Sequence, residues 1–513
     1  MYPKKDRNTE LKTIPNGPYL DHLYRYQYLL SLAFLLLIYH NIFLTYGFSD
    51  DYAILWFSLK HDPPIINMLI RGGRLLAAFL LDHSFRTAHT VENLKYIRFI
   101  GLLGTWVGSI IFFRYLRKLN WPRFNALIIS LIITVTPSFA LYISWTCTFL
   151  VPWAFVLSFS SCIIFLNSYQ STRTHRYLSY MISFLMLLCS FFIYQPSATG
   201  FILPLSLYVL KRPKSTSLKQ LLTALALFVF SLLVYMALFK FSLYAFGLQK
   251  LERAGISTHL GKDFISFFYT DLKQIVRLSF IFPGKIMKII LTILGYSILL
   301  LFYFRLLKHT LDGKMYYWCF LFLILSLPFT NIPRIASAEK WICYRSLGMT
   351  GLFMVIVFFY MMDKIKLKPL KLTIISVFAL SMTFSCYKNI NQKFINIQAT
   401  EYKLVSDKIK QALSSNNKEL ILVRPNWFSH TKNCFADEYG IPSNYPSWVS
   451  LPFINLVIEE KTGEIKMVKN QLNKTSSNQI KVQIYNPEDK FKNQKQYPVI
   501  NVKQILESQK KSD

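Results

Sequence analysis

Acidic residues are scarce in this sequence, which has 26 aspartates and glutamates against 58 lysines and arginines and a formal net charge of +32. A basic balance of this size can mark a nucleic-acid-binding protein. Here, however, the basic residues lie in short segments between long apolar runs, which is the charge pattern of a multi-pass membrane protein. We therefore exclude nucleic acid as a partner and expect membrane lipids instead.

Cysteines and familiar enzyme motifs are also missing. The seven cysteines are scattered and form no C-x-x-C pair, so neither a zinc site nor a disulfide framework is indicated. There is no glycine-rich dinucleotide fingerprint, no P-loop and no H-E-x-x-H. His61, His83 and His89 lie near Asp62 and Asp82, but their spacing matches no metal motif, and interfacial polar residues are the better interpretation. We expect no cofactor. A divalent metal is conceivable at these residues but is not indicated by the sequence.

Long apolar runs are abundant, since 53% of the residues are hydrophobic. A helix that crosses a bilayer needs about 20 mostly apolar residues. On this scale we predict an α-helical polytopic membrane protein with about eleven transmembrane helices, at 27–46, 97–113, 125–142, 153–168, 178–194, 197–210, 220–239, 286–304, 316–330, 346–362 and 371–387. The run 197–210 is the weakest, because it is short and contains Pro204.

Basic residues predict the orientation of these spans. The N-terminal leader and every second loop are basic, whereas the short loops 144–148 and 195–199 contain neither lysine nor arginine. Lysine and arginine favour the cytoplasmic side, so the N-terminus is expected there and an odd number of spans puts the C-terminus in the periplasm. Residues 1–20 have no apolar core, so we expect the first span to be an uncleaved anchor.

Three segments on the predicted outer side are longer than a connection requires: 47–96, 241–285 and 331–345. In the first, residues 51–59 and 65–81 have helical apolar spacing but are too polar to span, so we expect helices in the interface plane. No predicted cytoplasmic segment is large enough to bind a nucleotide sugar, so any sugar donor is expected to be lipid-linked.

The last part of the chain has a soluble composition. It contains a predicted amphipathic helix at 395–413 and predicted strands at 419–423, 465–468, 480–485 and 499–502. We therefore divide the chain into a membrane domain, 1–390, which includes the outer loop 47–96, and a small C-terminal α/β periplasmic domain, 391–513.

Two adjacent carboxylates, Asp50 and Asp51, directly follow the first apolar run. Carboxylates are costly near hydrocarbon and tend to be kept there for function, although they may simply end a helix in water. Sugar transfer needs a general base for the acceptor hydroxyl. Neighbouring residues on a helix point about 100° apart. One carboxylate is thus the candidate base, and the other would hold the loop or a sugar hydroxyl. The sequence leaves open which is which.

Cationic side chains are needed to neutralise the departing phosphate, and arginine suits this role because it binds phosphate with two hydrogen bonds and stays charged. The donor-phosphate candidates on the outer side are Arg71, Arg74, Arg334, Lys340 and Arg345. Arginines at helix ends also reach out to lipid headgroups, which is the better interpretation of Arg71. The candidate sugar or acceptor contacts are Tyr52, Glu339 and Tyr344. Glu438 and Trp448 in the tail could contact a glycan, although a surface loop is the simpler expectation.

Taken together, these features resemble the GT-C class of polyprenyl-phosphate-sugar glycosyltransferases, and within it the Gtr-type O-antigen glucosyltransferases of Gram-negative bacteria. The likeness covers the chain to about residue 390. It is carried by Phe48-Ser49-Asp50-Asp51-Tyr52, by Gly73-Arg74-Leu75-Leu76-Ala77 and more weakly by Glu339…Tyr344-Arg345.

The resemblance implies an inverting enzyme of the bacterial inner membrane that takes part in serotype conversion. Its donor would be undecaprenyl-phosphate-linked glucose, and its acceptor would be O-antigen or lipopolysaccharide in the periplasm. The family role of the paired carboxylates is carried over to Asp50 and Asp51. An outward site also requires other proteins that synthesise and flip the donor.

Other functions remain open. A different GT-C transferase would use another sugar, or would act on lipid A or protein. A transporter or flippase of lipid-linked glycans usually has ionisable residues at mid-membrane depth and repeat symmetry, and this sequence has neither pattern. An O-antigen polymerase or ligase would not need a carboxylate pair directly after the first span. We therefore favour the transferase.

Overall fold

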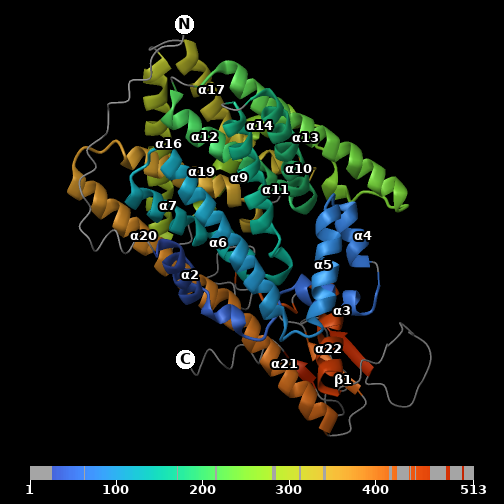
Figure 1. The fold of residues 1–513 in the computed structure, drawn as a ribbon. Coiled ribbons are helices and arrows are strands. Elements are labelled where there is room, and N and C mark those ends of the chain that lie inside the picture. Colours follow the sequence, from blue (N-terminus) through green and yellow to red (C-terminus); the bar gives the residue numbers. More distant parts are fainter. Residues whose placement is uncertain are drawn as a thin grey trace.

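One helix follows another along nearly the whole chain (Figure 1). The structure is a computed structural model. It describes residues 26–62, 64–169, 172–213, 216–279, 285–310, 314–338, 342–414, 419–423, 438–439, 441–444, 446–462, 481–485 and 499–501.

Within these ranges, five helices are long and apolar enough to cross a membrane. They are α6 (Leu94–Lys118), α9 (Val151–Ser168) with its preceding turn, α10 (Arg173–Ile193), α13 (Leu218–Ala245) and α20 (Lys368–Ile390) with its continuation. A sixth is present if α7 (Arg123–Thr134) and α8 (Pro137–Ser144), which are bent by 54° at their junction, count as one span. The protein is therefore α-helical, with several helices compatible with a membrane.

The other predicted spans also fall on helices. Three of these helices are apolar but shorter than a full span: α2 (Gln27–Ile38), α17 (Lys314–Phe329) and α19 (Gly348–Met362). The run 286–304 lies in α16 (Lys285–Thr310), and 197–210 is divided between α11 (Gln195–Ala198), a short 3-10 turn and α12 (Ile202–Lys211). Helices thus occupy all eleven positions, and five of them, or six with the bent α7–α8 pair, are both long and apolar enough to cross a membrane.

The first span differs from its prediction, because α2 ends at Ile38 and a 3-10 turn at His40–Phe43 follows it. The segment that follows is held by Arg98, whose guanidinium donates hydrogen bonds to the carbonyl oxygens of Ile42, Leu44 and Tyr46.

The first outer segment forms three helices, α3 (Asp50–Leu59), α4 (Pro64–Arg71) and α5 (Leu75–Ala88). The predicted helix at 65–81 is therefore wrong as one unit, because Gly73 has φ +76° and breaks it. The expected position of α3 in the interface plane stays a prediction. Most side chains of α3 from Asp51 onward are buried, so the helix is covered by its neighbours. The later outer segments contain α14 (Leu260–Ser266), α15 (Leu272–Leu278) and α18 (Ile332–Ala336).

The C-terminal part begins as an extension of the last membrane helix. Helix α20 passes through one π-helical turn, Asn391–Ile395, into α21 (Asn396–Ser414). Three strands, β1 (Glu419–Val423), β2 (Lys481–Tyr485) and β3 (Val499–Asn501), form a parallel sheet in the order β2-β1-β3. These three strand predictions are confirmed, while the predicted strand at 465–468 lies outside the described residues. A further helix, α22 (Ser447–Thr462), was not expected from the sequence.

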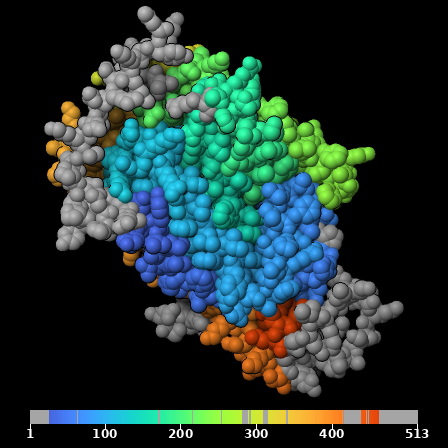
Figure 2. All heavy atoms as spheres, viewed as in Figure 1, coloured from blue at the N-terminus to red at the C-terminus, as the bar shows by residue number. Residues whose placement is uncertain are grey.

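The tail is packed against the start of the chain. In the space-filling view, the orange and red atoms of α21 and α22 lie directly beside the blue atoms of the N-terminal region (Figure 2). Helix α22 contacts both α3 and α21. The residues that follow the first apolar run are therefore enclosed by elements from the two ends of the sequence.

Candidate functional site

The loop before the two aspartates has a constrained backbone. Ser49 has φ 45°, a value that L-residues rarely adopt and that costs energy unless the surroundings hold it. Its amide donates to Ser443 Oγ at 3.2 Å, and the same hydroxyl lies 3.2 Å from the carbonyl oxygen of Gly47. A residue of the C-terminal segment thus holds the turn from which α3 begins.

Asp51 is fully buried and is bound by backbone amides. Its Oδ1 accepts from Cys147 N at 2.7 Å, and its Oδ2 accepts from Phe48 N at 2.9 Å and from Thr146 N at 3.3 Å. Burial raises the pKa of Asp51 to about 6, although these amides act in the opposite direction. Asp51 therefore ties the Phe48 loop to the turn before α9, and its oxygens face protein rather than an open surface.

Asp50 has different surroundings from its neighbour. Its residue is partly exposed, and its Oδ1 accepts a hydrogen bond from Trp448 Nε1 at 3.1 Å. The two carboxylates thus face different parts of the protein, as expected for neighbours on a helix. Of the two, Asp50 is the one that a substrate can reach.

Arg98, which the sequence analysis did not single out, supports the chain leading into this loop. It is fully buried in α6 and donates to the carbonyl oxygens of Ile42, Leu44 and Tyr46, each at 2.8 Å. Its guanidinium also lies 3.8 Å from the centroid of the Tyr46 ring. The sequence did hold a signal, because a lone arginine near the end of an apolar run is costly unless it is paired.

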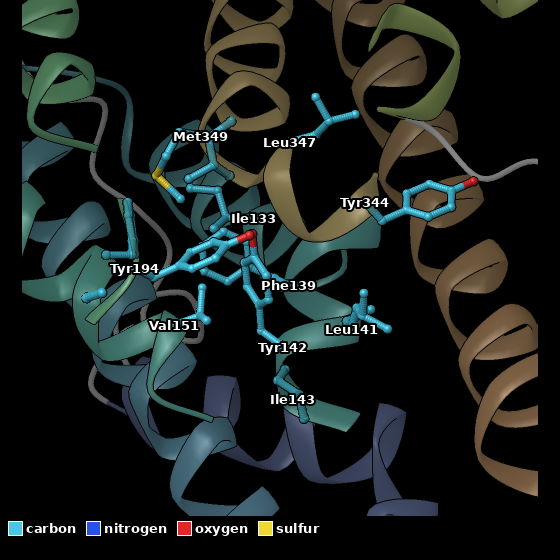
Figure 3. Close-up of a cluster of buried hydrophobic side chains, with 14 of the residues drawn as sticks. Ile133, Phe139, Leu141, Tyr142, Ile143, Val151, Tyr194, Tyr344, Leu347 and Met349 are labelled. Carbon is cyan, nitrogen blue, oxygen red and sulfur yellow. The ribbon is translucent and has the colours of Figure 1, made fainter. Parts of the chain in front are cut away.

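Arg74 and Arg345 are brought together from positions far apart in the chain. The Arg74 guanidinium lies 5.0 Å from the centroid of the Tyr194 ring, and the Tyr194 hydroxyl donates to the carbonyl oxygen of Arg345 at 3.0 Å. Tyr142 donates to the same carbonyl. Figure 3 shows the rings of Tyr142 and Tyr194 converging within the buried cluster beneath this point.

Arg74 and Arg345 lie in the same part of the protein as Asp50 and Asp51. The Arg345 guanidinium lies 5.3 Å from the centroid of the Trp145 ring, next to Thr146 and Cys147, whose amides bind Asp51. Arg345 also interacts electrostatically with Asp50. Arg345 further pairs with Glu438 at 3.6 Å. Four of the predicted site residues therefore gather around one point, with a buried acid from the tail beside them.

Glycine is required at the turn that carries Arg74. Gln195 Nε2 donates to the carbonyl oxygens of Gly72 and Gly73 at 3.1 and 3.2 Å, and the Tyr235 hydroxyl donates to that of Gly73 at 3.1 Å. A Cβ on Gly73 would lie 2.2 Å from the Tyr235 oxygen. The two glycines thus let this turn pack closely against α11 and α13. This packing fixes the start of α5 and the position of Arg74.

Other predicted phosphate ligands are engaged elsewhere. Arg71 Nε donates to the carbonyl oxygen of Gln249 at 2.7 Å, and Arg334 forms an ion pair with Asp271. Both arginines connect outer segments to one another. Lys340 lies outside the described residues.

The predicted sugar contacts Tyr52 and Tyr344 are buried. The Tyr52 hydroxyl accepts from Gly47 N at 3.0 Å, and its ring packs against Phe453. The Tyr344 ring packs against Tyr439 and points away from Tyr142 and Tyr194 (Figure 3). Glu339 lies outside the described residues.

The tail residues near the site are not part of a surface loop, contrary to the simpler expectation. Glu438 and Tyr439 are 5% and 4% exposed, because Glu438 pairs with Arg345 and the Tyr439 hydroxyl donates to the carbonyl oxygen of Pro137 at 2.9 Å. Glu401 of α21 is buried and accepts from Ser443 N at 2.6 Å. Burial raises the pKa of Glu401 to about 7.

Over the described part of the chain, no group of three or more histidine, cysteine, aspartate or glutamate side chains could hold a metal ion. His61 instead contacts Arg86 at 2.6 Å, and Arg86 pairs with Asp82 at 2.8 Å.

Comparison with models of protein families finds no match for the sequence, and comparison with curated proteins finds none.

Proposed function

We propose that this chain is an integral-membrane glycosyltransferase that moves a sugar from undecaprenyl phosphate to O-antigen or lipopolysaccharide at the periplasmic face of the bacterial inner membrane. The observation that carries the proposal is the convergence of both aspartates and two arginines near the turn 145–147: its amides bind Asp51, Arg345 packs on its Trp145 ring, and Tyr194 connects Arg74 to Arg345. One acid that a substrate can reach, beside two permanent cations, is the set of groups that this reaction requires.

The proposed membrane arrangement has eleven spans, a cytoplasmic N-terminus and a periplasmic C-terminal α/β domain. Helix α6 supports a site at one membrane face. Arg98, near its start, contacts the loop before Asp50, while Arg117 and Lys118 end it. At 1.5 Å per residue, Arg98 and Lys118 are separated by about 30 Å, which equals the thickness of the hydrocarbon layer.

In the proposed reaction, Asp50 takes the proton from an acceptor hydroxyl. The hydroxyl oxygen attacks the anomeric carbon, and the bond from that carbon to the phosphate oxygen breaks with inversion. The bonding electrons leave with the polyprenyl phosphate, whose charge Arg74 and Arg345 neutralise. Asp51 holds the loop, because both of its oxygens accept backbone amides. Glucose is the proposed sugar because of the resemblance to the Gtr-type enzymes.

The test is transfer of labelled glucose from polyprenyl-phosphate-glucose to lipopolysaccharide in membranes, at matched expression. Asp50→Asn should lower the rate by about a hundredfold or more, as loss of a general base does. Asp51→Asn should lower the thermal stability of the protein, because the substitution disturbs the Phe48 loop that Asp51 holds. Full activity of Asp50→Asn would overturn this assignment.

A donor panel separates the related alternatives. Transfer from another lipid-linked sugar alone would identify a different GT-C transferase. Movement of an intact lipid-linked glycan across the membrane, without transfer, would identify a flippase.

A further inference from the structure

Helix α22 lies beside α3 and runs in the same direction. Three contacts define the register: Trp448 with Asp50, Phe453 with Tyr52, and Lys60 with Glu459, whose charged atoms are 2.5 Å apart. The Phe453 and Tyr52 ring centroids are 4.2 Å apart, and both side chains are fully buried. This packing sets the position of Trp448 at the start of α22.

Trp448 is nonetheless exposed. Its neighbours Val449 and Phe453 are fully buried, while Trp448 is 62% exposed and Leu451, one turn later, is 44% exposed. Trp448 and Leu451 thus present two large apolar side chains on the surface of α22. The exposed ring also borders Asp50, the proposed base.

An exposed tryptophan ring can anchor a protein at the membrane surface or bind a ligand, and the hydrogen bond to Asp50 distinguishes between these two roles. A tryptophan that anchors a protein at the membrane surface directs its N–H toward the headgroup region. Indole has a single donor, and here it is bound to the Asp50 carboxylate at 3.1 Å. The ring is therefore oriented by the site rather than by the bilayer, and its apolar faces remain for a ligand.

We propose that Trp448 is the platform for a sugar ring of the acceptor and thus selects a saccharide acceptor over a protein side chain. A pyranose has an apolar C–H face that packs on an indole ring, while its hydroxyls at the rim stay free for a carboxylate. This placement brings an acceptor hydroxyl to Asp50. The inference rests on the proposed function, because it takes Asp50 as the base.

Two measurements test the proposal on the purified full-length protein in detergent. The first is calorimetric binding of the oligosaccharide released from lipopolysaccharide, with no donor present. The second is transfer kinetics with varied acceptor and donor. Trp448→Ala should raise the acceptor Kd and KM by about tenfold or more and leave the donor KM unchanged. Trp448→Phe should keep acceptor binding within about threefold but lower kcat, because it keeps a ring and loses the bond to Asp50.

The matched control is Trp318→Ala, which removes an exposed tryptophan from a different helix, α17. It should leave the acceptor Kd, the acceptor KM and the donor KM unchanged. Thermal unfolding of each variant checks its fold. Unchanged acceptor binding in Trp448→Ala, or lost binding to vesicles of anionic lipid as its sole effect, would overturn the platform. Failure of wild type to bind the oligosaccharide would overturn it as well. If wild type binds the oligosaccharide through Trp448 but transfers no sugar, the proposed reaction fails and the platform stands.

Discussion

At the scale of single residues, the arrangement depends on a few buried charges that hold backbone. Arg98 and Asp51 have opposite charges and bind opposite backbone groups. The Arg98 guanidinium donates to carbonyl oxygens before the loop, and the Asp51 carboxylate accepts from amides in the loop and in the turn before α9. Neither side chain faces an open surface. We infer that both stabilise the loop from which Asp50 is presented.

Arg98→Gln should destabilise the protein by about 3 kcal/mol, because about three hydrogen bonds to buried carbonyls are lost at about 1 kcal/mol each. Thermal unfolding in detergent measures this effect. Arg114→Gln, which alters an exposed arginine on the same helix, is the control and should change stability little. Equal melting temperatures for the two variants would show that Arg98 is not needed for the fold.

Stability should also depend on pH through Glu401. Its folded pKa of about 7 lies above the ordinary value of about 4.3 for glutamate, so the folded protein holds a proton that the unfolded chain releases. Stability should therefore fall as pH rises from about 4.5 to about 7. Asp51 acts in the same direction up to about pH 6. In Glu401→Gln, the fall in melting temperature between pH 6 and 7.5 should disappear. An unchanged slope would contradict this account.

At the scale of elements, the sequence predicted the positions of the apolar helices better than their ends. All eleven predicted runs fall on helices, but the early end of α2 was not predicted, and the division of 65–81 depends on the positive φ of Gly73. Asp50, Asp51, Arg74 and Arg345 were named from local chemistry. Their meeting could not be predicted, because it depends on how distant helices pack. Trp448 was named as a possible glycan contact, but its hydrogen bond to Asp50 could not be predicted for the same reason.

Gly73→Ala should disturb the α4–α5 turn through two effects, the positive φ and a clash with Tyr235. Gly247→Ala isolates the first effect, since Gly247 has φ 62° and an added Cβ would meet nothing within 4 Å. The glycosyl-transfer rate should fall at least about tenfold in Gly73→Ala, because Arg74 is displaced, and should change little in Gly247→Ala. Similar rates in both variants would show that the turn does not position Arg74.

At the scale of the whole molecule, the orientation of the spans can be tested with single cysteines. Lys250 and Lys366 are exposed and lie in loops of predicted opposite sides. In intact cells with a permeable outer membrane, a membrane-impermeant maleimide should label Lys250→Cys. It should label Lys366→Cys only after the inner membrane is opened. The unsubstituted protein measures labelling of the native cysteines, and the reverse pattern would invert the proposed topology.

The continuous helix from Lys368 to Ala412 has a mechanical consequence. Its 45 residues extend about 68 Å, while the hydrocarbon layer is about 30 Å thick. In the proposed membrane arrangement, more than half of this helix therefore extends beyond the hydrocarbon layer and supports the C-terminal segment. Because α21 also contacts α22, this long helix is a rigid support for the α3–α22 packing that places Trp448 beside Asp50.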